Sequence, residues 1–208
     1  MPDSIGFLFS FSGQRANKKE EVFYEAQRLM QEQYSHLPIC FMDDIVSKKP
    51  LPIRWSEAHR ALHPTTRLLT AFAEFNEAGV KKIKPAIADG NIVVTLRYGL
   101  DVFLDSIAET DCPQARNEAT ELWHKHLVPS RVIRGTPKPQ YLINQVLKPA
   151  ESNVLAFCSR QERDINEYFD GTGQKPPIYL KGQTVKECAK EAIRHILTPT
   201  AESLKLAT

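Results

Sequence analysis

Short, almost continuous apolar runs alternate with longer amphipathic stretches along this chain, and that alternation is the strongest constraint on its fold. Runs of this kind lack a polar residue at every second position. They are typical of strands that are buried on both faces of a parallel sheet. The predicted strands are residues 5–11 (IGFLFSF), 38–43 (PICFMD), 91–96 (NIVVTL), 140–146 (QYLINQV) and 177–181 (PIYLK).

The stretches between these runs have helical periodicity. The predicted helices are residues 18–34, 65–90, 114–127, 149–169 and 184–197. This succession predicts an α/β fold, with a doubly wound, parallel five-stranded sheet flanked by helices. We expect one domain over residues 1–197 and a loose tail at 198–208. Ligands of such folds bind beyond the carboxyl ends of the strands, so the residues that follow each strand are the candidates for a site.

The composition indicates a soluble globular protein, with 42% hydrophobic and 25% charged residues among 208. A formal net charge of +2 does not by itself indicate a nucleic-acid partner. The four cysteines form no CxxC pair, which predicts no metal site and fits a reducing cytosol. The opening MPDSIGFLFSFSG has no basic region and is typical of a strand rather than a signal peptide. No apolar run approaches the ~20 residues of a membrane helix, so we expect a cytoplasmic protein.

The first predicted strand leads into SGQRANKK, which has the length and the lysine of a phosphate-binding loop. In the pattern G-x-x-x-x-G-K-[ST], glycines let backbone N–H groups surround phosphates, the lysine reaches the outer phosphates and the hydroxyl holds Mg²⁺. Aligned by its lysine, this loop has Ser12 and Asn17 at the glycine positions, Lys18 at the lysine and Lys19 in place of the hydroxyl. Gly13 is one residue out of register. Because an ammonium cannot ligate Mg²⁺, the loop as aligned lacks its metal ligand.

The same residues also fit an ordinary helix start. Asn17 followed by Glu20 resembles a capping box, which needs no ligand. A helix N-terminus with two lysines attracts phosphate in either case. The sequence leaves both interpretations open.

A longer segment, IKPAIADGNIVVTLRYGLDVFLDS at 83–106, resembles the thymidylate kinase family. That family has an Ile-x-Pro-Ala-Leu helix end, a glycine turn, an apolar strand and then Asp-Arg-Tyr. RLLTAFAEFNEAGVKK, PQYLINQVLKPAESNVLAF and IYLKGQTVKECAKEAIRHIL are similar to further elements in the family's order. The resemblance implies a P-loop kinase-like three-layer sandwich. In an active member it also implies ATP as donor, dTMP or a related deoxynucleotide as acceptor, and Mg²⁺.

The resemblance also exposes departures at the family's functional positions. Its Asp-Arg-Tyr is Leu96, Arg97 and Tyr98 here, so the carboxylate is lost, whereas the arginine that holds the acceptor phosphate is kept. A structural ion pair is the alternative role for Arg97. Counting back from Pro85 places Phe75 where the family has an acceptor-side arginine.

Several other residues are candidates with an ordinary structural alternative. Asp43 and Asp44 follow the second predicted strand and would bind a metal or a sugar hydroxyl, or else form a turn. Phe72 would stack on a base or belong to the core. Arg160 and Arg163 would clamp the transferred phosphoryl group, as a lid does in the family, or lie on a solvated helix end.

The resemblance further implies a homodimer packed through the helices beside the Asp-Arg-Tyr strand. Val102, Phe103 and Ile107 in DVFLDSIAE supply an apolar face for that contact, and packing within one chain is the alternative. Gel filtration with light scattering separates the two.

Three hypotheses follow from these residues. The first is a catalytically degenerate relative of thymidylate kinase that binds a nucleotide, a phosphate or a partner. The second is an active, divergent nucleoside monophosphate kinase, with Lys18 on the donor phosphates, Arg97 on the acceptor phosphate, and Arg160 or Arg163 at the transition state. The third is an interaction or nucleic-acid-associated module that reuses the fold surface, although we do not expect a nucleic-acid partner.

Overall fold

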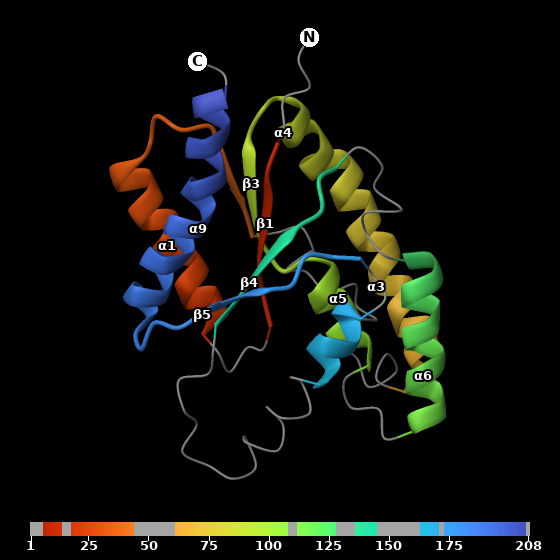
Figure 1. Cartoon of the computed structure of the whole chain (residues 1–208). Helices are drawn as coiled ribbons and strands as arrows, with labels where there is room; N and C mark the ends of the chain where they lie inside the picture. Colours follow the sequence, from red (N-terminus) through yellow and green to blue (C-terminus); the bar gives the residue numbers. More distant parts are fainter. Residues whose placement is uncertain are drawn as a thin grey trace.

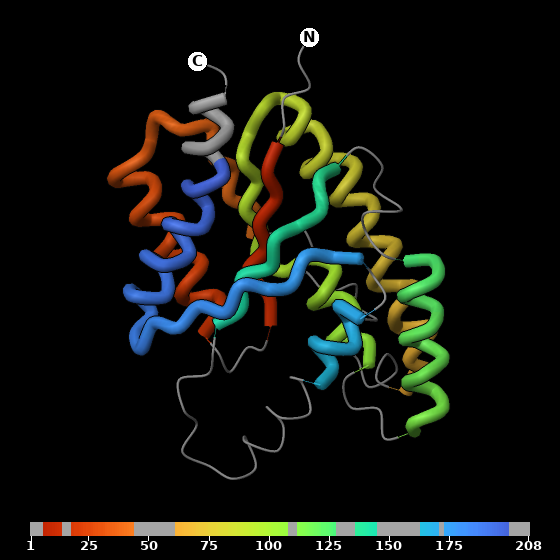
Figure 2. The backbone as a smooth tube through the Cα atoms, viewed as in Figure 1, coloured from red at the N-terminus to blue at the C-terminus, as the bar shows by residue number. Residues whose placement is uncertain are grey.

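The structure is a computed structural model, shown in Figures 1 and 2, that describes most of the chain. The described residues are 6–13, 18–43, 61–107, 112–127, 136–144, 163–170 and 173–206, with side chains up to residue 199. Asn17, Asp44 and Arg160, which the sequence proposed as site residues, lie outside these ranges.

The five predicted strands form one sheet in which every pairing is parallel, which confirms the predicted fold class. The strand order is β2-β3-β1-β4-β5, so β1 lies at the centre of the sheet (Figure 1). The strands are β1 (Leu8–Ser12), β2 (Ile39–Met42), β3 (Ile92–Leu96), β4 (Gln140–Asn144) and β5 (Ile178–Leu180).

Helices cover both faces of the sheet and give a three-layer sandwich (Figures 1 and 2). On one face, α1 (Lys19–Gln33) and α9 (Val185–Leu206) pack against each other. On the other face, α3 (Pro64–Ala78) packs on α5 (Gly99–Ile107) and α6 (Pro113–Leu122). The central strands are buried from both sides, as their near-continuous apolar runs predict.

Alternation along the strands divides the core into two clusters. Phe9 and Phe11 of β1 point toward α1 and α9, where they join Phe23 of α1. Leu8 of β1 belongs to the cluster beneath α3 and α5. Because successive side chains of a strand point to opposite faces, one buried strand supplies both layers.

The long helix predicted at 65–90 is divided into three parts. After α3, residues Gly79–Ile83 form the π-helix η2, and Lys84–Ala88 form α4. Pro85 explains the wide turn, because a proline has no N–H for the helical ladder and its ring clashes with the carbonyl four residues earlier. The helix predicted at 114–127 likewise continues from α6 into a π-helix, η3 (Trp123–Leu127).

Two other predicted helices differ at their ends. Residues 163–169 are helical, and most of the predicted 149–169 helix lies outside the described residues. At the C-terminus, α9 continues to Leu206. The helix passes through Pro199, and the loose tail expected at 198–208 stays a prediction. Within this last stretch, the Thr198 hydroxyl donates to the Arg194 carbonyl at 2.7 Å.

The core beneath α3 and α5 is strongly aromatic. Phe75 meets Tyr98 edge-on, with ring centroids 4.6 Å apart, and Phe72 meets Trp123 at 5.9 Å. The hydroxyls of Tyr141 and Tyr168 form a hydrogen bond of 2.5 Å inside the same cluster. Edge-to-face contacts of this kind add stability beyond the area that they bury.

The apolar face of α5 packs into this core. Val102, Phe103 and Ile107 are all buried within the chain, which is the alternative that the sequence left open. A homodimer therefore stays a prediction, and these three side chains are already covered by packing within the chain. None of the helices in the described part of the chain is long and apolar enough to cross a membrane.

We predict that the three buried tyrosines make the fold sensitive to alkali. Burial raises the pKa of Tyr98, Tyr141 and Tyr168 above the ordinary value of about 10. Below pH ~10 these groups are neutral in both folded and unfolded states and have no effect on the pH dependence. Above it, the unfolded chain loses their protons first, so the free energy of unfolding should fall by roughly 1 kcal/mol per pH unit for each tyrosine.

The measurement is tyrosinate absorbance during alkaline titration, compared with loss of the folded circular dichroism signal. The two should change together for the buried tyrosines. A Y141F/Y168F variant should reduce the cooperative absorbance step, whereas Y24F, at an exposed position, should leave that step unchanged. Tyrosinate formation by the buried residues in a protein that stays folded would contradict the prediction.

Candidate functional site

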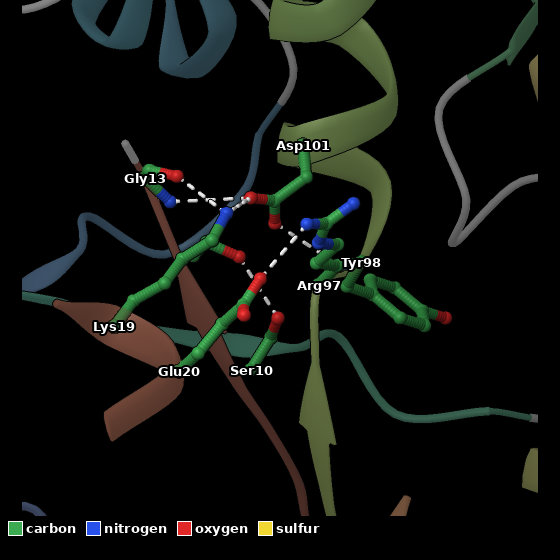
Figure 3. Close-up of polar contacts among 8 residues, drawn as sticks. Ser10, Gly13, Lys19, Glu20, Arg97, Tyr98 and Asp101 are labelled. Atoms are coloured by element: carbon green, nitrogen blue, oxygen red, sulfur yellow. Dashed lines mark hydrogen bonds and ion pairs between the residues drawn. The ribbon is translucent and has the colours of Figure 1, made fainter. Parts of the chain in front are cut away.

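The sheet order places a topological switch point, the crevice position of open α/β sheets, at the carboxyl ends of β1 and β3. These strands are neighbours, yet the chain leaves β1 for α1 on one face and leaves β3 for α5 on the other. Such a change of direction is where open α/β sheets bind ligands. Gly13 follows β1, Arg97 follows β3, and both lie at this point (Figure 3).

The start of α1 is held in an unusual backbone conformation. Lys18 is the N-cap residue with φ 53° and ψ 30°, in the left-handed region, and its side chain makes no capping hydrogen bond. Gly13 has φ 107°, a conformation that glycine adopts without steric cost. α1 therefore begins one residue later than a capping box of Asn17 and Glu20 requires, and Asn17 itself lies outside the described residues.

Lys19, the first residue of α1, turns its side chain into the crevice. Its ammonium donates to an Asp101 carboxylate oxygen and to the Gly13 carbonyl (Figure 3). The side chains of Lys19 and Asp101 are only 5% and 4% exposed. A buried cation at a helix N-terminus opposes the helix dipole, so the carboxylate beside it is needed to offset that cost.

Asp101 joins three segments of the chain. One carboxylate oxygen, which accepts from Lys19, also accepts from the Gly13 N–H at 3.3 Å, and the other accepts from the Tyr98 N–H at 3.1 Å. The residue lies in the first turn of α5, where a negative charge interacts favourably with the helix dipole. It thus connects the β1–α1 loop to the β3–α5 junction.

A second ion pair lies further out. Arg97 donates through Nη2 to Glu20 at 3.0 Å (Figure 3). The Arg97 side chain is 20% exposed and that of Glu20 is 49% exposed. Arg97 has φ 71°, and its N–H donates to the Phe11 carbonyl at 3.0 Å, which fixes its backbone against β1.

These contacts change how the loop compares with a phosphate-binding loop. The lysine whose ammonium contacts Gly13, at the start of the loop, is Lys19. Lys18 is exposed, and its Nζ lies 3.8 Å from Oε2 of Glu21. Counted from Gly13, the pattern G-x-x-x-x-G-K-[ST] falls on Gly13, Lys18, Lys19 and Glu20. Lys18 then stands at the second glycine, which its positive φ explains. A role for Lys18 in binding phosphate stays a prediction.

The remaining candidates lie away from this crevice or are engaged in packing. The Ser12 hydroxyl is buried and pairs with that of Ser10 at 2.9 Å, and Asp43 accepts from the Tyr24 hydroxyl at 2.8 Å. Phe72 and Tyr98 are buried in the aromatic core, so stacking of either ring on a base would require that core to open. Arg163 is exposed on the 163–169 helix.

Asp101 and Glu20 are the two site residues that sequence reasoning missed. Asp101 could have been found, because it is a carboxylate in the first turn after a buried strand. Glu20 was interpreted as half of a capping box, and its pairing with Arg97 depends on the contact between α1 and the end of β3.

The charges of the crevice balance one another. Among the described residues there, Lys19 pairs with Asp101 and Arg97 pairs with Glu20, so the charges of these four side chains sum to zero. Within the described ranges, no group of three or more histidine, cysteine, aspartate and glutamate side chains is arranged to hold a metal ion. Such a site can bind a small anion by exchange of a carboxylate, and these four described side chains offer no excess of positive charge.

The fold has a solved counterpart. The chain is similar to the crystal structure of thymidylate kinase from Ehrlichia chaffeensis, with a TM-score of 0.52 and 16% sequence identity, over 92% of this chain and 98% of that one. At this identity the likeness shows the fold alone. It supports the P-loop kinase-like architecture that the sequence resemblance predicted.

Comparisons of the sequence alone do not show a family for this chain. No protein-family model matches this chain. A segment of 58 residues is 36% identical to large ribosomal subunit protein uL18 of Nitrosococcus oceani. This segment is 28% of the present chain and 48% of the ribosomal protein, so the match spans about half the length of that relative and carries no functional argument.

We predict that Lys19 and Asp101 are strongly coupled in stability. Lys19→Met leaves the Asp101 carboxylate buried without its cation, which should lower the free energy of unfolding by about 3–5 kcal/mol. The double variant K19M/D101N removes both charges and should be more stable than the sum of the single variants predicts. Denaturant unfolding of the four proteins measures this coupling.

The matched control is the neighbouring exposed lysine. Lys18→Met should change the free energy of unfolding by no more than about 0.5 kcal/mol. Additive effects of K19M and D101N would show that the two side chains do not form the pair described.

Proposed function

We propose that this chain is a thymidylate-kinase-like protein that binds a phosphorylated ligand at the β1–β3 crevice but does not transfer phosphoryl groups. One observation carries the proposal: the lysine that reaches the loop start is buried against Asp101 and the Gly13 carbonyl. Its ammonium is already satisfied by the protein, at the place where a kinase needs it for donor phosphates.

Phosphoryl transfer depends on positioning and on positive charge, from metal and side chains, clustered around the transferred group. In this crevice Lys19 and Arg97 each have their own carboxylate. Freeing Lys19 would leave Asp101 buried without a partner, and the cost of doing so exceeds that of breaking an exposed pair.

The residues do not fit the ATP–Mg²⁺ pair that the fold implies. Leu96 occupies the position of the family's carboxylate, and its side chain is buried in the core beneath α1. Glu20 stands where the loop pattern has its metal-binding hydroxyl, and its carboxylate pairs with Arg97. The crevice therefore favours a ligand held through Arg97 without a metal.

One observation favours the second candidate, an active and divergent nucleoside monophosphate kinase. The spacing from Gly13 to Lys19 is that of a phosphate-binding loop, and Lys19 reaches back to the first residue of that loop. Asp101 would then supply the carboxylate that Leu96 lacks, beside the lysine rather than at the strand end.

The deciding experiment is a phosphoryl-transfer assay with ATP, Mg²⁺ and a panel of monophosphates that includes dTMP and dUMP. We expect product formation by the wild type to be no greater than that by K19M/D101N, a variant in which both members of the buried pair are replaced. Circular dichroism should first establish that this variant is folded.

Turnover by the wild type that K19M/D101N lacks would overturn the proposal and establish the kinase. Thermal shift with dTMP and with inorganic phosphate, each with and without Mg²⁺, tests the binding half. A ligand at ~100 times its Kd should add roughly 2.7 kcal/mol to stability, and we expect that gain to be independent of Mg²⁺.

A further inference from the structure

The two ion pairs of the crevice differ in how readily a ligand could replace them. Lys19 and Asp101 are almost completely buried, and Asp101 also accepts two backbone hydrogen bonds. Glu20, in contrast, is 49% exposed and lies on the outer side of the crevice. An exposed ion pair contributes little to stability, whereas separating a buried pair is costly. Any anion that enters will therefore displace Glu20 before it displaces Asp101.

Arg97 is the fixed member of the outer pair. Its backbone is held by the hydrogen bond from its N–H to Phe11 at the end of β1, and its side chain is mostly buried. Glu20 is in the first turn of α1, and its side chain can turn to solvent without leaving a buried charge behind, since Arg97 would meanwhile bind the incoming anion. The exchange replaces one anion by another at the same guanidinium.

We propose that Glu20 is a built-in competitor for the anionic ligand of Arg97, so that a carboxylate of the chain itself sets the affinity of this site. Guanidinium binds phosphate strongly because several N–H groups can point at its oxygens. Glu20 accepts one hydrogen bond, from Nη2 of Arg97. A phosphate with three acceptor oxygens can accept more hydrogen bonds from the same guanidinium. Lys19 takes no part, because its ammonium is held by Asp101 and the Gly13 carbonyl.

This inference rests on the proposed function, because it takes the buried Lys19–Asp101 pair to be permanent. It differs from that function in naming the residue that controls affinity. A carboxylate that competes with the ligand lowers affinity by its own binding free energy, so its removal must raise affinity.

The chain offers a matched pair of variants for the test. Glu20→Gln removes the competing charge while keeping the shape of the side chain. Glu21→Gln removes the neighbouring charge, which lies 3.8 Å from Lys18 and is similarly exposed at 59%. Both variants change the net charge equally, so any non-specific electrostatic effect on anion binding is common to the two.

Calorimetric titration with inorganic phosphate and with dTMP, at constant ionic strength, measures the effect. E20Q should bind inorganic phosphate about two- to fivefold more tightly than the wild type. E21Q should bind it as the wild type does. Adding Arg97→Lys to E20Q should abolish the gain, because lysine lacks the planar fork of donors. A gain shared by phosphate and dTMP indicates recognition of the phosphate alone, and a larger gain with dTMP indicates a phosphomonoester ligand.

Equal affinities of E20Q and the wild type for both probes would overturn the inference, as would an equal gain in E21Q or a gain that survives R97K. Failure of the proposed function is distinguishable, because it appears as turnover in the phosphoryl-transfer assay or as the absence of phosphate binding in the wild type and E20Q alike, whereas failure of this inference alone leaves binding by the wild type intact. The titrations contain no ATP, so their result on Glu20 does not depend on that assay.

Discussion

The ammonium of Lys19 can stay buried only because Asp101 and the Gly13 carbonyl surround it, and much of the crevice depends on that arrangement. Through Asp101, the end of β1 and the start of α1 are tied to the junction between β3 and α5. These segments leave the sheet on opposite faces. The pair adds to the backbone hydrogen bond from Arg97 to Phe11, which holds the ends of β1 and β3 side by side.

The aromatic core explains why the acceptor side of the expected kinase site looks different here. Phe75 stands where the residue count placed the family's acceptor-side arginine, and it packs edge-on against Tyr98 of the Leu-Arg-Tyr segment. Phe72 and Trp123 extend the same cluster toward α6. Packing thus fills a region in which a nucleotide binder would need exposed polar groups.

The sequence predicted the sheet well because its signal is local. Each strand is a short apolar run, and burial on both faces of a parallel sheet leaves that run nearly continuous, as in β1 and β3. The sequence did not predict the ion pairs, because Lys19 and Asp101 are far apart in the chain and the strand order brings them together. The sequence also could not show which of Lys18 and Lys19 turns into the crevice. That depends on the left-handed backbone conformation at Lys18, which points the two side chains in different directions.

The π-helix η2 has a consequence for how this chain is aligned with others. A π turn closes its hydrogen bond one residue later than an α turn, so it holds one more residue without lengthening the path of the helix in proportion. If residues are counted across 79–83 as though the helix were a regular α-helix, a residue before Gly79 is assigned to the wrong side of the helix. A relative with an uninterrupted helix would match α3 with an offset of one position on the side before Gly79. Equivalences for Glu74 and Phe75 are therefore better assigned by superposing backbones than by counting from Pro85.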